Sequence, residues 1–476
     1  MFKKHFHTPT KTLLALALIS LLAACNSSDD DEKDNNDHHS EHNLSQSMGR
    51  LVYSLDNAAG LQIYDQTVEA SERFTATNVS SENSASLVLA KSGLTTAVLE
   101  GERLSVVSSG LEHMQSDHAH THDVELLTPS SFTGVTKVVA TGDYFSTLTT
   151  SGASDLISSQ GEVTSHSWSN VVYPTLALAG DHFLKFTSGT GGAVNLTVVD
   201  NNNSTGGGSI YLRPNNEWEM VESLSCPDGI KDAAQTENLA LVLCGDGSLR
   251  WLISDYMPTN EGHPKKGEHL YITQKYAATT DRLEGATGEV TKNSNEFIRG
   301  IQGLTATFDD DNVIAAWSDD QLWLVNGHND HPHRGDLSSI LGADFGKVLN
   351  VAATTDDDAL AVISDSGKIA ITRFDIENNN PVGKGEVIKE QLGEVGALWT
   401  SSNSQLLAGA NEFFAIQTHK GVLYHLDAHS DEDDYHLHGT HQHDSLQQLH
   451  SGVFAHFQDD HDDHDDHDDD HSHGSH

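Results

Sequence analysis

Short β-rich runs that meet in tight polar turns recur along most of the chain. Each instance joins two runs of Val, Ile, Leu or aromatic residues through a turn of Gly, Asp, Asn or Ser. This pattern is typical of a β-hairpin, because Gly and Asp tolerate a positive φ angle. Residues 242–252 and 361–371 show it most clearly. The predicted hairpins lie within Leu51–Tyr64, Ala85–Val107, Lys137–Ile157, Thr175–Val199, Asn238–Ile253, Asn312–Val325, Ala359–Phe374 and Leu406–Leu426.

The spacing of these hairpins predicts the fold. Their starts are about 50 residues apart on average, which is the period of four-stranded propeller blades. No long helical periodicity interrupts them. We therefore predict an all-β fold, a β-propeller of seven or eight four-stranded blades over residues 49–427, and the eight hairpins favour eight. A pair of β-sandwiches is the alternative, whereas a β-helix has shorter turns than this period.

The chain is strongly acidic. It has 476 residues, of which 70 are Asp or Glu and 26 are Lys or Arg, so its net charge is −44. Nucleic acid is excluded as a natural partner, because phosphate binding needs a basic face. A hydrophobic fraction of 36% and only 3 Cys also exclude an integral membrane bundle and a disulfide-stapled miniprotein. The 31 His residues therefore become the main clue to function.

The N-terminus has the features of an export signal. Two Lys residues precede a short apolar run, Leu13–Leu22, which is too short to remain as a spanning helix. The run ends in Leu-Ala-Ala-Cys25, which resembles the bacterial lipobox, so residues 1–24 are predicted to be cleaved and Cys25 to carry lipid. An ordinary signal peptide is the alternative. Asn26 favours a lipid anchor in the outer membrane that leaves the protein in the periplasm, and the polar residues 25–48 are predicted to form a disordered tether.

The first cluster of metal-ligand side chains lies in the loop 112–123, between two β-rich runs. It contains four imidazoles and three carboxylates. Alternate residues of an extended segment point to one face, so neighbouring His of the row 118, 120 and 122 can converge on one ion. Zinc takes four ligands in a tetrahedron, so the loop must curl or another loop must complete the site. The predicted primary site comprises His113, Asp117, His118, His120, His122 and Asp123; a polar surface loop is the alternative.

Two further regions are rich in His. The segment 327–334 supplies a possible second site at His328, His331 and His333, although Arg334 would oppose a cation and a solvated turn is the alternative. Residues 428–476 are dense in His, Asp and Glu, and repulsion between like charges predicts a disordered tail that chelates metal weakly at many places. An acidic solubilising tail is the alternative. The predicted weak sites are His436, His438, His441, His443, His461, His464, His467, His471 and His473.

The donor types indicate which metal these clusters would bind. Imidazole with carboxylate suits Zn²⁺, and Cu²⁺ or Ni²⁺ are also compatible. Ca²⁺ prefers oxygen alone, and the 5 Met are too few for a Cu⁺ carrier. Zinc is therefore the predicted ligand. Since a ligating imidazole must be neutral, affinity should fall as the pH drops through about 6.5.

Two cysteines remain after the predicted cleavage, Cys226 and Cys244. In an oxidising periplasm such a pair is a disulfide candidate. The ring would contain roughly 18 residues and stabilise the fold by roughly 3 kcal/mol. A metal site made of thiolates is the alternative.

Together these features resemble the AztD-type periplasmic zinc metallochaperones. The resemblance is carried by the His/Asp loop from His113 to Asp123 and by Cys226-Pro227 with Cys244-Gly245-Asp246-Gly247, within an all-β repeat chain. It covers residues 49–427 and not the tail, and the lipobox departs from a freely diffusing carrier. The resemblance implies a β-propeller that hands zinc to the solute-binding protein of a zinc ABC transporter.

The predicted function is therefore a periplasmic protein that chaperones or buffers zinc for import. The alternative is an outer-membrane propeller scaffold that binds protein partners and chelates metal incidentally. The sequence contains no HExxH, GxSxG or phosphate-binding loop. We therefore do not predict an enzyme.

Overall fold

The protein is described by a computed structural model that covers residues 49–457 with gaps, and all of these residues belong to one compact unit. Within this part of the chain, no helix has the length and apolar character needed to cross a lipid bilayer. The gaps are 82–83, 116–117, 128–131, 143, 179–180, 203–209, 213–218, 222, 237–238, 257–269, 277–300, 307–312, 319–321, 327–332, 336–340, 355–358, 374–383 and 429–434.

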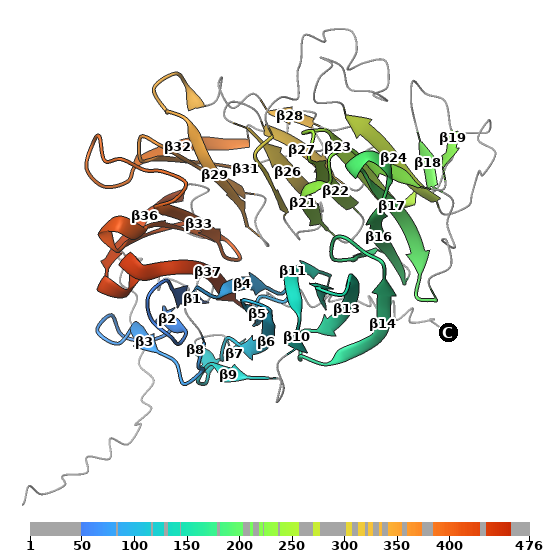
Figure 1. The fold of residues 1–476 in the computed structure, drawn as a ribbon. Helices are drawn as coiled ribbons and strands as arrows, with labels where there is room; N and C mark the ends of the chain where they lie inside the picture. Colours follow the sequence, from blue (N-terminus) through green and yellow to red (C-terminus); the bar gives the residue numbers. More distant parts are fainter. Residues whose placement is uncertain are drawn as a thin grey trace, which may run out of the picture. The chain divides into compact units, whose positions relative to one another are not determined.

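The described residues form eight sheets of at least four strands, whose neighbouring strands are antiparallel except for one parallel pair in the fifth sheet (Figure 1). We number them as blades. The first blade contains β37 (Leu449–His456), β1 (Gly49–Leu55), β2 (Gln62–Asp65) and β3 (Phe74–Ala76). The second contains β4 (Ser86–Leu89), β5 (Thr95–Glu100), β6 (Arg103–Ser108), β9 (Glu125–Leu126) and β10 (Phe132–Thr133), and the third contains β11 (Val135–Thr141), β12 (Tyr144–Thr149), β13 (Ala153–Ser158) and β14 (Val163–Ser169). The fourth contains β15 (Leu176–Leu178), β16 (His182–Ser188), β17 (Val194–Asp200) and β20 (Leu224–Cys226).

The remaining blades continue in chain order. The fifth contains β21 (Ile230–Gln235), β22 (Leu239–Cys244), β23 (Leu249–Tyr256) and β24 (Leu270–Tyr276); β18 (Ile210–Leu212) pairs in parallel with β24, and β19 (Glu219–Val221) lies beside β18. The sixth contains β25 (Gly303–Ala306), β26 (Val313–Trp317), β27 (Leu322–Asn326) and β28 (His333–Gly335), and the seventh contains β29 (Val348–Ala353), β30 (Ala359–Ser364), β31 (Lys368–Arg373) and β32 (Lys384–Gln391). The eighth contains β33 (Ser404–Ala408), β34 (Glu412–Gln417), β35 (Val422–Ala428) and β36 (Tyr435–Gln442). A separate two-stranded hairpin contains β7 (Leu111–Gln115) and β8 (His118–Thr121), and the 3-10 helices are η2 (Thr190–Gly192), η4 (Thr418–Lys420) and η5 (Asp444–Gln448).

One edge strand of each blade contacts the corresponding strand of the next. Contacts join β37 to β4, β4 to β11, β21 to β25, β25 to β29, β29 to β33 and β33 to β37. In blades three to five, Thr141 links three such strands: its hydroxyl accepts from the Ala177 N–H (2.6 Å) and donates to Gln235 Oε1 (2.5 Å). Each predicted hairpin lies in a different blade. The prediction of an all-β propeller is therefore confirmed, and the described residues form eight blades.

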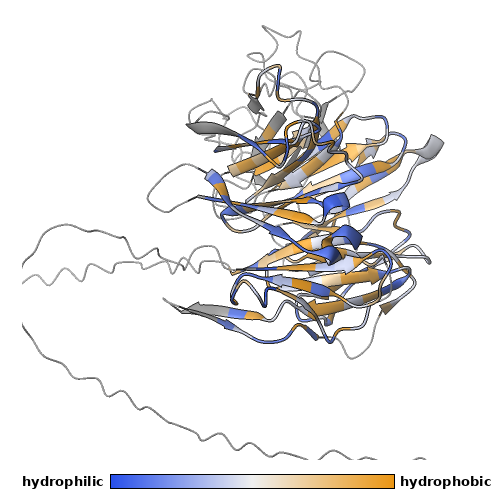
Figure 2. Ribbon diagram, turned by 90° about the vertical axis from the view of Figure 1, so that its left-hand side faces the viewer, coloured by the Kyte–Doolittle hydropathy of each residue, from blue (hydrophilic) through white to orange (hydrophobic). Residues whose placement is uncertain are grey.

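The core lies between adjacent blades, where apolar faces of neighbouring sheets pack together. Between the eighth and first blades, the rings of Phe414 and Phe454 stack with centroids 4.0 Å apart, and both side chains are buried. Between the third and fourth, Trp168 packs on Phe183 at 4.5 Å. Figure 2 shows hydrophobic residues following the strands and hydrophilic residues gathering at the turns. Burial of this apolar surface, at about 25 cal/mol per Å², is the main source of stability.

The predicted end of the propeller at residue 427 is wrong. Residues Tyr435–Gln442 form the outer strand of the eighth blade, and Leu449–His456 form β37. β37 pairs along its length with β1, from Gly49↔His456 to Leu55↔Leu449, so the first blade contains both ends of the folded chain. The strand pairs and buried Phe454 and Ala455 stabilise this segment despite the acidity around it. Residues 458–476, like the predicted signal peptide 1–24, the tether 25–48 and Cys25, lie outside the described residues.

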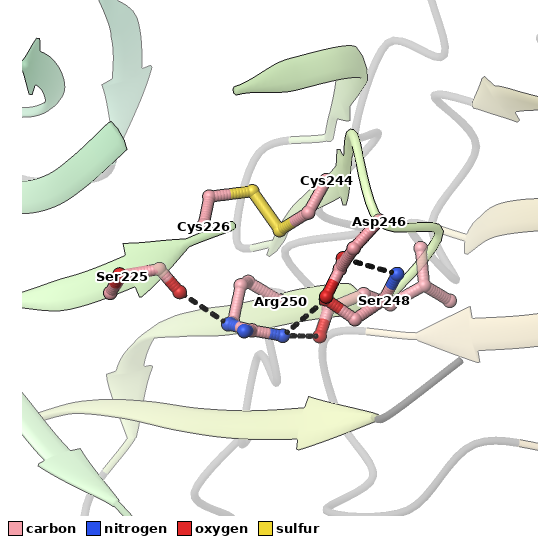
Figure 3. The surroundings of a disulfide bond; sticks show 7 residues. Ser225, Cys226, Cys244, Asp246, Ser248 and Arg250 are labelled. Carbon is pink, nitrogen blue, oxygen red and sulfur yellow. Dashed lines mark hydrogen bonds between the residues drawn. A yellow bond between two sulfur atoms is a disulfide. The ribbon is translucent and has the colours of Figure 1, made fainter. Parts of the chain in front are cut away.

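The predicted disulfide between Cys226 and Cys244 is present (Figure 3). Cys226 ends β20 of the fourth blade and Cys244 ends β22 of the fifth, so the bond ties two neighbouring blades together. Both cysteines are fully buried. Below the bond in Figure 3, Arg250 donates through Nε to the Ser225 carbonyl (2.8 Å), a second link between these blades.

Candidate metal site

Three ligand side chains converge at one end of the eighth blade. His425 and Asp427 are alternate residues of β35 and therefore point to the same face of the sheet. On the neighbouring strand β36, Leu437 pairs with Leu426 but Gly439 pairs with His425, so His438 is the extra residue of a β-bulge. Bulges redirect side chains. This one places His438 beside the His425–Asp427 pair.

The geometry of this group suits a divalent ion. One ligand atom from each of His425, Asp427 and His438 lies within 4.8 Å of the other two. Zinc at about 2.0–2.1 Å from each ligand needs separations of about 3.3 Å, which small side-chain rotations would supply. Asp427 and His425 are buried, with 6% and 7% of their surface exposed, while His438 is exposed. The site therefore has a fixed inner wall and one ligand that faces solvent.

The buried wall also fixes the orientation of the His425 ring. The ring stacks on Phe414 with centroids 4.9 Å apart and planes 8° from parallel. Its Nε2 lies 2.6 Å from Oε2 of Glu412, a carboxyl group that is almost completely buried. The His438 ring is 5.3 Å from that of His425, and His436 is 6.1 Å from His438.

Burial shifts the pKa values in this group in opposite directions. It lowers the pKa of His425 to about 4, an effect that the nearby Asp427 opposes and that Arg73 and His436 reinforce. It raises the pKa of Glu412 well above the usual value, and the Asp427 charge raises it further. His425 is therefore a neutral imidazole at physiological pH, the form that coordinates metal.

The predicted primary site lies on the β7–β8 hairpin. The backbone register places His113 directly opposite His120, and Gln115 opposite His118. His122 follows β8, with Nδ1 2.8 Å from the carbonyl oxygen of exposed Asp123 and Nε2 3.9 Å from Glu112 Oε1. Asp117 and the side chains of His113 and His118 lie outside the described residues. The predicted ligand set therefore stays a prediction.

The root of this hairpin is held by the first blade. The buried Arg50 donates through Nη1 to the carbonyls of Ser109 (3.0 Å) and His122 (2.6 Å), and through Nε to Asp65 (2.7 Å). Gly110 makes this close approach possible: its φ is +79°, and a Cβ there would lie 2.2 Å from the His122 carbonyl oxygen. The first residues of the hairpin are therefore held in place by the buried Arg50.

The other predicted ligands are scattered. His333 begins β28 opposite Leu324, and its side chain, together with His328 and His331, lies outside the described residues. His441 lies with its ring 5.2 Å from that of Tyr64, and burial lowers its pKa. His443 stacks on Phe74 at 4.4 Å. Among the predicted tail sites, the structure brings only His438 into a three-ligand group within the described residues, and the sites from His461 to His473 lie beyond these residues.

His425 and Asp427 were not predicted as ligands, because neither lies in a dense local cluster of His and Asp. The signal was present in the alternation of Tyr424-His425-Leu426-Asp427, which presents two polar ligands from an otherwise apolar strand. The missing step was the pairing of this strand with β36.

Comparisons with known proteins agree with the fold. No protein-family profile matches the chain, and a comparison with curated proteins finds no match. By structure, the chain is similar to the apo form of AztD from Citrobacter koseri, with 13% identity and a TM-score of 0.55 over 86% of this chain and 98% of that one. A second structure of the same protein gives 14% identity and a TM-score of 0.54, over 86% and 99% of the chains. The resemblance drawn from the sequence is thus confirmed for the fold.

Proposed function

We propose that this chain is a periplasmic zinc-binding protein that carries or buffers Zn²⁺ for import. The observation that supports this most directly is the convergence of His425, Asp427 and His438 at the end of the eighth blade. Two imidazoles and one carboxylate are a common zinc donor set. The AztD-like fold gives further support, because the resemblance implies a zinc metallochaperone.

Release of the ion follows from the unequal exposure of the ligands. His425 and Asp427 hold zinc from the buried side, and the exposed His438 faces any acceptor. An incoming ligand from a partner would take an open coordination position and then displace His438, so that the ion is transferred stepwise without being released as free zinc. The proposed acceptor is the solute-binding protein of a zinc ABC transporter, and the proposed role is not catalytic.

The remaining His-rich regions are proposed to have supporting roles. The β7–β8 hairpin would hold a second, weaker ion, and the tail beyond residue 457 would raise the local zinc concentration through tethered ligands. A lipid on Cys25 would keep the protein at the outer membrane. An anchored protein of this kind would store zinc and release it locally, and would not diffuse with it across the periplasm.

A competition titration with a chromogenic zinc chelator tests the proposal. We expect full-length protein to show one tight site that His425→Ala weakens by at least about 100-fold, because loss of an outer-shell partner alone commonly costs 10–100-fold. Parallel titrations with Cu²⁺ and Ni²⁺ measure selectivity. His419→Ala is the matched control, because His419 lies in η4, at the opposite end of the β34 and β35 strands. Equal zinc affinity in the two variants would sink the proposal.

A further inference from the structure

Glu412 is a carboxyl group in an unusually closed environment. It begins β34, only 1% of its surface is exposed, and it pairs across the sheet with the buried Asp427. Placing two carboxyl groups this close in a buried position is unfavourable. Its polar contacts in the described part of the chain are with two side chains, Gln66 and His425. Because burial of Glu412 beside Asp427 destabilises the fold, we expect a functional reason for a carboxyl group at this position.

The contact with Gln66 defines the role of one carboxyl oxygen. Gln66 Oε1 accepts a hydrogen bond from the backbone N–H of Gly49 (2.9 Å), which can only donate. The amide group is therefore oriented with its NH₂ toward Glu412, and Nε2 donates to Oε2 (3.2 Å). Glu412 Oε2 thus accepts a hydrogen bond from Gln66 and is held from the first blade.

The same oxygen contacts His425. Nε2 of the imidazole lies 2.6 Å from Glu412 Oε2, and the stacked Phe414 holds the ring plane. A neutral imidazole has one N–H donor and one nitrogen with a free lone pair. If Nε2 carries the proton and donates to Glu412, the lone pair is on Nδ1.

We propose that Glu412 is a positioning residue that holds the Nε2–H tautomer of His425 and thereby makes Nδ1 the zinc ligand. The ring keeps its proton on Nε2 when zinc binds, and the Nδ1 lone pair forms the coordinate bond. Outer-shell carboxylates commonly orient ligating histidines in this way. The zinc role rests on the proposed function, whereas the tautomer is a property of the metal-free protein.

The tautomer can be measured directly. Two-bond ¹H–¹⁵N correlation spectra of ¹⁵N-labelled full-length protein report which nitrogen carries the proton, and the signals missing from His425→Gln assign the residue. We expect the Nε2–H form without metal and a change at Nδ1, with Nε2 still protonated, after one equivalent of Zn²⁺. An Nδ1–H form without metal, or zinc at Nε2, would overturn the proposal.

Variants separate positioning from structure. We expect Glu412→Leu to weaken zinc binding 10–100-fold, and Glu412→Gln, which keeps an acceptor oxygen, to recover most of that loss. Gln417→Leu is the matched control: it removes an equally buried polar side chain from the other end of β34, and it should leave zinc affinity unchanged. Thermal unfolding of each metal-free variant measures the effect on the fold.

The two proposals fail in distinguishable ways. If wild type lacks the tight site, the proposed function fails, while the tautomer spectrum still tests Glu412. If wild type binds zinc tightly and Glu412→Leu binds equally well, the positioning role fails alone. If Glu412→Gln and Glu412→Leu weaken binding equally, the acceptor oxygen does not carry the effect, and positioning is again overturned.

Discussion

The site on the eighth blade and the β7–β8 hairpin concentrate the same donor types in different structural settings. His425 and Asp427 are on a strand with neighbours on both sides, and their positions are fixed by packing, stacking and a buried carboxyl group. The hairpin is a two-stranded sheet outside the eight blades, and in the described part of the chain Arg50 of the first blade holds its root. Ligands that the fold already holds in place bind an ion at little cost in conformational entropy. A denser set of ligands on a less supported hairpin must be ordered when the ion binds, which lowers its affinity.

The largest effect is expected from shortening the chain. Truncation after residue 427 removes β36 and β37, so β1 and β35 each lose one of their two partner strands, and His438 is removed as well. We expect no cooperative unfolding transition and no tight zinc site, measured by calorimetry and chelator competition. The control is truncation after residue 457, which retains every strand that the structure describes. If the shorter chain unfolds cooperatively and binds zinc like the control, the eighth-blade site does not depend on closure of the first blade.

A second substitution targets the support of the hairpin. Arg50→Met leaves Asp65 buried without its cation, and breaking such a pair costs about 3–5 kcal/mol. We expect a lower free energy of unfolding in urea and weaker zinc binding by the hairpin.

Arg50→Lys is the control for this experiment, because it retains the charge but not the three-way hydrogen bonding. It should destabilise less than Arg50→Met. A hairpin that still binds zinc at full strength in Arg50→Met would show that Arg50 contributes to stability alone.

The disulfide lies apart from both sites, so removing it tests whether zinc binding depends on the overall stability of the fold. The double substitution Cys226→Ser and Cys244→Ser opens a ring with a sequence separation of 18 and should cost about 3 kcal/mol of unfolding free energy. Zinc affinity at the eighth-blade site should not change. A large loss of affinity in folded protein would mean that this site responds to global stability, and its apparent rigidity would need another explanation.

The smallest effect is expected from the half-buried hairpin residues His120 and His122. His120→Ala with His122→Ala should lower the free energy of unfolding by about 1 kcal/mol or less, because both side chains are only half-buried. The variant should lose a weak zinc equivalent and keep the tight one, measured by titration calorimetry. Loss of the tight site instead would reverse the ranking of the two regions.

Local sequence patterns were sufficient to predict the blades but not their closure. Each hairpin is a short-range feature, with alternation and turn residues close together, and each predicted hairpin lies in its own blade. β36 and β37 also alternate, with Tyr435 and Leu437 as the inward residues of β36, but the surrounding charge obscured the pattern. The partner of β37 is at the opposite end of the sequence, a pairing that no local pattern specifies.

The candidate site was only partly predictable for the same reason. The density of His in the sequence pointed to the hairpin and the tail, and it included His438 for the wrong reason. His425 and Asp427 stand in a largely apolar strand, and their role depends on the bulge at His438 and on the carboxyl group of Glu412 from a third strand. Chain composition indicates which metal the donor types would suit. Strand register determines where.

The pairing of β1 with β37 has a consequence for biogenesis. Gln66, which holds Glu412, comes from the first blade, while Glu412, His425 and His438 come from the last to be synthesised. A chain still emerging from the ribosome cannot assemble this candidate site. Under the proposed zinc role, loading would then wait until the first and eighth blades have both folded.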